Sequence, residues 1–163
     1  MEHFASHEFV HQVKNLSDDE LGPAWAAVMR EMHNRELIRS WNNPVADYAE
    51  RIVADRLNLK LAGKSAQGYD ATDADERVRY QIKSRRLTSE NPSRQLGVIR
   101  KLEDNEFDFL IAAIFDEELI LSEMWSIPHA VIKDFATYVP TLNGHRITLR
   151  PALTSHESVI RLP

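Results

Sequence analysis

The chain of 163 residues contains no cysteine, which excludes disulfide bonds and thiolate metal sites. It also lacks a glycine-rich phosphate loop and a Gly-x-Ser-x-Gly elbow, which argues against a nucleoside triphosphatase and a serine hydrolase. The longest apolar run, Phe109 to Phe115, is too short to span a bilayer. The first residues show no basic segment followed by an apolar one. We therefore expect a cytoplasmic protein with no membrane segment and no nucleotide cofactor.

Positive charge is scarce overall but concentrated in one segment. The formal net charge is −5, yet the stretch from Arg77 to Lys101 holds eight basic residues and one acid, Glu90. The rest of the chain holds 12 basic and 24 acidic residues. A basic strip on an acidic body is typical of a phosphate-binding surface, although a solvated polar face has the same composition. The residues that we expect to contact phosphate groups are Arg79, Arg85, Arg86, Arg94, Arg100 and Lys101.

Hydrophobic patterning predicts an α/β protein in which helices cover a mixed sheet. The expected helices cover residues 2–13, 17–39, 44–59 and 126–135, with a further one opening at Asn91 and including Leu102. The expected strands cover residues 69–72, 77–86, 107–115, 119–125 and 145–150. Ser17 to Glu20 reads as a capping box for the second helix. We expect residues 1–43 to form an N-terminal helical extension and residues 44–163 to form the α/β core, within one compact domain overall.

The hairpin over residues 69–86 carries the clearest candidate site. Alternation places Gln81 and Lys83 on one face of its second strand and Ile82 on the other. Paired strands lie about 5 Å apart, so Asp70 can meet Gln81 and Lys83 on the polar face. Oxygen ligands suit a hard divalent cation. We therefore expect Asp70, Gln81, the Ile82 main-chain carbonyl and Glu50 to hold Mg²⁺ (or Mn²⁺), with Lys83 assisting attack by water.

These residues resemble the motif of the PD-(D/E)xK nuclease superfamily, whose members share the restriction-endonuclease-like fold. Asp70 matches the first acidic position, and Gln81 with Lys83 matches the second motif in the QxK form of Mrr-like enzymes. Glu50 matches the glutamate on the helix before the first core strand. Two positions depart from the pattern, because Tyr69 replaces a proline and Gln81 replaces a carboxylate.

The resemblance covers residues 44–86 and implies a metal-dependent DNA endonuclease. Its catalytic residues would be Asp70, Gln81, Lys83 and Glu50, and the basic strip would bind the DNA backbone. Cutting both strands of a duplex implies a homodimer, for which the N-terminal helices offer an interface that includes Trp25 and Met29. The alternative is a DNA-binding module that kept the fold but hydrolyses poorly, because the Gln81 amide weakens the metal site.

A second metal motif lies near the N-terminus. His7, Glu8 and His11 form an HExxH pattern, which on a helix can hold zinc and supply a general base. His3 extends the spacing, and Glu31 or Glu36 would have to provide the third ligand. A zinc peptidase is therefore a third hypothesis, set against a solvated terminal helix in which the short pattern arises by chance.

Overall fold

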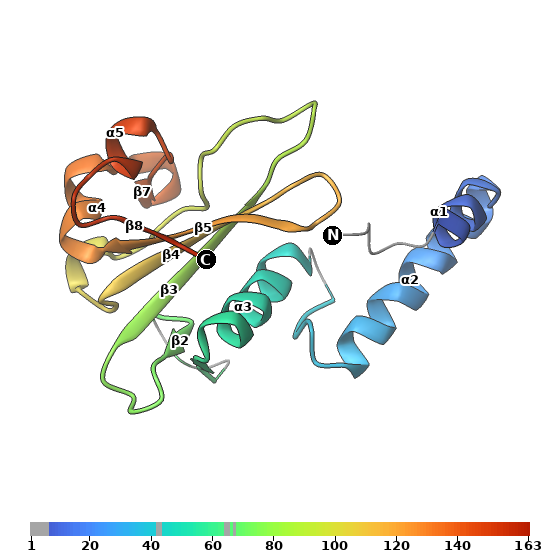
Figure 1. The fold of residues 1–163 in the computed structure, drawn as a ribbon, viewed down its shortest axis with the longest axis horizontal. Coiled ribbons are helices and arrows are strands. Elements are labelled where there is room, and N and C mark those ends of the chain that lie inside the picture. Colours follow the sequence, from blue (N-terminus) through green and yellow to red (C-terminus); the bar gives the residue numbers. More distant parts are fainter. Residues whose placement is uncertain (1–6, 42–43, 64–65, 67) are drawn as a thin grey trace. The chain divides into compact units, whose positions relative to one another are not determined.

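A six-stranded mixed sheet organises the C-terminal part of the chain, and two helices make up most of the N-terminal part (Figure 1). The computed structural model describes residues 7–41, 44–63, 66 and 68–163. The chain divides into two compact units, Met1–Pro44 and Val45–Pro163. The α/β class expected from the sequence is present, with a mixed sheet flanked by helices.

The N-terminal unit is helical. Its helices are α1 (His7–Lys14) and α2 (Asp18–Asn34). The predicted capping box forms, because the Glu20 carboxylate accepts hydrogen bonds from the Ser17 main-chain N–H and from the Ser17 hydroxyl, both at 2.8 Å. The sequence predicted that this helix would continue to Arg39. It ends at Asn34, and Glu36 adopts a left-handed conformation with φ of 58° that an α-helix cannot continue through.

The sheet has the strand order β1-β2-β3-β4-β5-β8. Its strands are β1 (Lys60–Leu61), β2 (Ala71–Thr72), β3 (Arg79–Arg86), β4 (Phe109–Phe115), β5 (Leu121–Pro128) and β8 (Ile160–Leu162). β3 and β4 run parallel, and the other neighbouring pairs are antiparallel. β4 is the apolar run, and its residues from Leu110 to Phe115 are all buried, as expected for a central strand covered on both faces.

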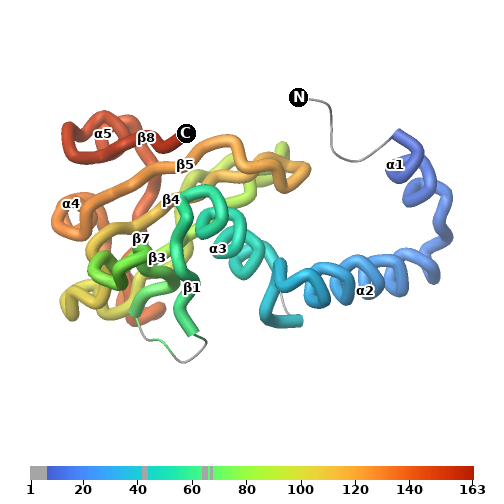
Figure 2. Tube along the Cα trace, turned by 60° about the horizontal axis from the view of Figure 1, so that its bottom comes forward, coloured from blue at the N-terminus to red at the C-terminus, as the bar shows by residue number. Residues whose placement is uncertain are grey.

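Different helices cover the two faces of the sheet (Figures 1 and 2). α3 (Pro44–Leu57) packs Ala49 and Val53 against one face, which includes Ile82 and Ile111. The other face bears Leu110 and alternate residues along β4, and it packs against α4 (His129–Phe135) and α5 (Pro151–Thr154). The period-two alternation of β4 therefore separates the two cores.

The segment after β3 is extended, where the sequence predicted a helix opening at Asn91. Gln95 bridges to Thr148, and Ile99 bridges to His145. Helical geometry begins only in the short 3-10 turn η1 (Leu102–Asp104). Three residues lie between the two bridges on one side and two on the other, so the register shifts by one residue. Because of this shift, Leu96 and Ile99 both reach the core from an extended segment, although they are three residues apart. Their spacing therefore resembles that of a helix where no helix forms.

A small ribbon continues from the extended segment. It consists of β6 (Thr137–Val139), the 3-10 turn η2 (Pro140–Leu142) and β7 (Gly144–Arg146). Asn143, with φ of 44°, and Gly144 lie at the turn that the sequence predicted from Asn-Gly. His145 pairs with Tyr138 on one side and with Ile99 on the other, so three extended segments lie side by side over the core.

Candidate functional site

Asp70 and Gln81 meet across the β2–β3 hairpin. Ala71 is paired with Tyr80, so the preceding Asp70 lies opposite Gln81 on the same face. The Gln81 amide nitrogen donates to Asp70 Oδ2 at 2.5 Å, and the Ile82 main-chain N–H donates to the same oxygen at 2.7 Å. The Asp70 N–H in turn donates to the Tyr80 carbonyl at 2.8 Å. Main-chain and side-chain bonds together therefore fix the position of this carboxylate.

Lys83 lies on the same sheet face as Gln81, as the strand alternation predicted. In the parallel pairing with β4, Gln81 is opposite Leu110 and Lys83 is opposite Ala112, and both partners belong to the α4 side of the core. The Lys83 stem passes close to Gly97, where an added Cβ would lie 3.7 Å from Lys83 Cδ. Among the described residues, no carboxylate or carbonyl pairs with the Lys83 ammonium. This cation is therefore available to a ligand.

A pocket of about 320 Å³ opens beside these residues. Its lining residues are Gly68, Gln81, Lys83, Val98, Arg100, Lys101 and Glu106. Three cations and one carboxylate thus face a shared space, which favours an anionic ligand. The Glu106 carboxylate lies 3.9 Å from Lys101 Nζ. Glu106 was missed by sequence reasoning, because it lies on a loop 25 residues beyond Gln81 with no strand pattern to place it.

Gly68 forms one wall of this pocket through its backbone. Its φ is +84°, and a Cβ at this position would overlap the Glu106 side chain. A residue other than glycine would therefore displace Glu106 from the pocket. Here the requirement for glycine reflects both the positive φ and the close approach of a side chain.

Glu50 is the candidate residue that comes from a helix. It lies on α3, directly after Ala49, and α3 covers the sheet face that carries Ile82. Gln81 and Lys83 face the other way, toward the α4 side. The sheet therefore stands between α3 and Lys83, and of the candidate residues only Gln81 and Lys83 line the pocket.

Several arginines of the basic strip have partners within the fold. Arg79 donates to both Asp108 oxygens and to a main-chain carbonyl. Burial raises the pKa of Asp108, but hydrogen bonds from Arg79 outweigh it and hold that pKa below the ordinary value. Arg85 donates to the Ser93 carbonyl at 2.9 Å. Arg86 donates to the carbonyl of Glu117. These bonds tie the strip to neighbouring loops.

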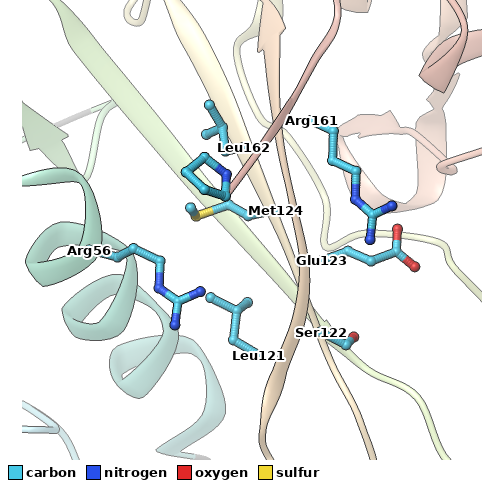
Figure 3. Close-up of a pocket in the computed structure, with 8 residues that line it drawn as sticks. Arg56, Leu121, Ser122, Glu123, Met124, Arg161 and Leu162 are labelled. Carbon is cyan, nitrogen blue, oxygen red and sulfur yellow. The ribbon is translucent and has the colours of Figure 1, made fainter.

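Arg94 is bound most completely. It donates to both carboxylate oxygens of Glu123, at 2.8 and 2.7 Å, and Trp125 Nε1 donates to Glu123 at 2.9 Å. These hydrogen bonds lower the pKa of Glu123 to about 2, although burial opposes the shift. The bonds from Arg94 make the largest contribution. Figure 3 shows Glu123 beside a second pocket of about 250 Å³, with the Arg161 guanidinium pointing toward its carboxylate. This part of the strip is a structural ion pair.

The N-terminal histidine motif lacks a third ligand in the part of the chain that the structure describes. His7, Glu8 and His11 lie on α1, whose residues are all exposed. Over residues 7–41, 44–63, 66 and 68–163, no three His, Asp or Glu side chains are grouped to hold a metal ion. His3 falls outside the described residues. The geometry therefore gives no support to a zinc centre here.

The donor atoms around Asp70 fit a hard divalent cation in kind. Asp70 Oδ1 accepts no hydrogen bond from the described residues, since both bonds go to Oδ2. Gln81 presents its nitrogen to Asp70, and half a turn of the carboxamide presents its oxygen instead. One carboxylate, one carboxamide and main-chain carbonyls suit Mg²⁺, which retains several water ligands.

Comparison with known proteins adds no assignment. No protein-family model and no curated protein sequence matches the chain. No helix among the described residues has the length and apolarity needed to cross a bilayer. Function is therefore inferred from the pocket and its residues.

Proposed function

We propose that this chain is a Mg²⁺- or Mn²⁺-dependent phosphodiesterase that cleaves DNA as an endonuclease, built on a restriction-endonuclease-like fold. The observation that carries the proposal is the contact between Asp70 and Gln81 beside Lys83, at a pocket that also holds Arg100 and Lys101. A carboxylate and an amide at a metal position, with cations facing the same space, suit a phosphodiester substrate.

Each residue has a separate task in this proposal. Asp70 and Gln81 would hold the cation, which when bound polarises the phosphate and lowers the pKa of a bound water. Lys83 stabilises negative charge that develops on the phosphate oxygens and orients the attacking water. Arg100 and Lys101 bind the flanking phosphate groups, which positions the DNA without reading its sequence.

The direct test is cleavage of supercoiled plasmid and linear DNA in Mg²⁺ or Mn²⁺. Lys83→Ala should lower the cleavage rate at least about 100-fold, because it removes the charge nearest the reacting phosphate. Lys60→Ala is the matched control, since Lys60 is an exposed lysine of β1 paired with Glu76 outside the pocket. No metal-dependent nicking by the unchanged protein would reject the enzyme proposal.

One observation favours the second candidate, a DNA-binding module without hydrolysis. Gln81 already satisfies Asp70 by donating a hydrogen bond, so this carboxylate needs no cation for compensation. Gln81→Glu would place two carboxylates at that distance, and their repulsion should lower the melting temperature in the absence of metal. Mn²⁺ should then raise the melting temperature of the variant more than that of the parent. An equal response to Mn²⁺ in both proteins would remove Gln81 from the proposed metal site.

A homodimer is part of the proposal, because a duplex has two antiparallel strands and each chain carries one such pocket. Trp25 is 57% exposed on α2, so it can supply apolar contact area, whereas Met29 is buried at 3% and cannot. Trp25→Ser should shift the sedimentation equilibrium toward monomer. Arg30→Ser, on the same helix, is the control and should leave the equilibrium unchanged.

A further inference from the structure

A third pocket, which is lined by cations, lies outside the candidate nuclease site and apart from the pocket beside Glu123. It has a volume of about 330 Å³, which is within the range of small-ligand sites. Its lining residues are Gln95, Phe135, Thr137, Val139, Arg146, Thr148, Arg150 and Ala152. None of these residues lines the pocket beside Lys83. No acidic side chain is among these described residues, so the charge of this pocket is positive.

Strand alternation builds the floor of this pocket. Arg146, Thr148 and Arg150 alternate with Ile147 and Leu149, which are buried in the core at 1% and 3% exposure. The two apolar residues therefore anchor the segment, while the two arginines and the threonine face the pocket.

Flanking segments complete the polar surface. Thr137 is paired with Arg146 in the β6–β7 ladder, and Gln95 is bridged to Thr148 on the opposite side. Paired residues project to the same face, so two guanidiniums, two hydroxyls and a carboxamide gather on it. Phe135, at the end of α4, adds an aromatic wall and holds an edge-to-face contact with His156, with ring centroids 6.0 Å apart.

Arg146 and Arg150 differ from the arginines that serve the fold. Arg79 and Arg94 each have a carboxylate partner within 3.3 Å. By contrast, no carboxylate or carbonyl of the described residues pairs with either guanidinium in this pocket. Two such arginines in a concave site with hydroxyl donors are suited to a dianionic oxyanion, because the planar guanidinium binds two oxygens of such a group in a bidentate manner.

We propose that this pocket binds the terminal phosphate monoester of a nucleotide, either free or at the 5′ end of a polynucleotide. Arg146 and Arg150 bind the phosphate, which carries nearly two negative charges at pH 7. Thr137, Thr148 and Gln95 donate hydrogen bonds to phosphate or sugar oxygens. Phe135 packs against the base or sugar. Binding here does not depend on the proposed nuclease activity.

Calorimetric titration of the full chain with adenosine 5′-monophosphate and with adenosine tests the monoester requirement. Two further arms use an eight-residue oligothymidine with and without a 5′-phosphate, which separates the free nucleotide from the polynucleotide end. We expect the phosphorylated form in at least one pair to bind at least 10-fold more tightly than its unphosphorylated counterpart. Equal affinities within both pairs, or no binding at millimolar ligand, would overturn the proposal.

Variants locate the binding. Arg146→Gln with Arg150→Gln should weaken binding of the phosphorylated ligand at least 10-fold, while Arg30→Gln with Arg77→Gln removes the same charge elsewhere and should change it less than twofold. Thr148→Val keeps both arginines and should weaken binding about 3- to 10-fold, because it removes a hydroxyl donor. Lys60→Ala, which removes an exposed lysine outside both pockets, should bind as the parent does. Equal weakening by the two double variants would refute the assignment to this pocket.

Discussion

Asp70 has a structural role in the hairpin and a proposed role as a metal ligand, and two substitutions separate them. Asp70→Ala removes the acceptor for the Ile82 N–H and the Gln81 amide, which should cost about 1 to 3 kcal/mol of unfolding free energy. Asp70→Asn keeps an acceptor oxygen but removes the charge, so it should cost less stability and still abolish metal-dependent cleavage. Urea unfolding and plasmid nicking on the same preparations measure both effects. Cleavage by Asp70→Asn at the parent rate would exclude the carboxylate as a metal ligand.

Because of Glu123, the free energy of unfolding should depend on pH in the acidic range. Its pKa is about 2 in the fold against an ordinary 4.5, so its contribution is complete above pH 4.5 and is lost as the pH falls toward 2. The side chain is 24% exposed, so we expect about 2 to 3 kcal/mol after screening by solvent. Urea unfolding at pH 6 and pH 3 should show a smaller fall for Glu123→Gln than for the parent. Parallel falls in both proteins would contradict the assignment to this pair.

At the scale of elements, β7 contacts the extended segment 95–99, whose Val98 lines the pocket beside Lys83 and whose Gln95 lines the pocket with Arg146. An added Cβ at Gly144 would overlap the Val98 side chain and lie 2.9 Å from the Ile99 carbonyl oxygen. Gly144→Ala should therefore destabilise the protein by about 1 to 3 kcal/mol, as overpacking does. Gly97→Ala, with only an ordinary contact at 3.7 Å to Lys83, should change stability far less. Equal unfolding midpoints for the two variants would show that this contact is not tight.

The sequence pattern predicted those elements in which buried residues recur at a regular spacing along the chain. The apolar run of β4 and the alternation of β3 were sufficient to place both strands and to set Asp70 opposite Gln81. β8 was missed because it has three residues and Ile160 is 59% exposed, which leaves no pattern to read. Glu106 depends on loop placement, which no local periodicity encodes. The same holds for the arginine partners, since Arg94 and Glu123 lie 29 residues apart.

At the scale of the whole molecule, the chain carries a net charge of −5, and the cations of its basic strip differ in whether they have partners within the fold. Arg79, Arg85, Arg86 and Arg94 donate to carboxylates, carbonyls or amide oxygens of their own fold. Lys83 and Arg100 line a pocket without such partners among the described residues. The proposed DNA binding should therefore depend on few cations, although the basic strip is long.

The salt dependence of DNA binding tests this division. Removing one cation that binds a phosphate group should reduce the slope of log affinity against log salt concentration by about 0.9 for duplex DNA. Arg100→Gln should produce this change, because its guanidinium faces the pocket. Arg85→Gln removes the same charge from the same strip, but Arg85 already donates to Ser93 and Asn91, so its slope should match that of the parent. Fluorescence anisotropy of a labelled duplex, without divalent metal and between about 50 and 200 mM salt, provides the slopes. Equal reductions in both variants would mean that the whole strip contacts DNA, and the pocket would then no longer define the binding site.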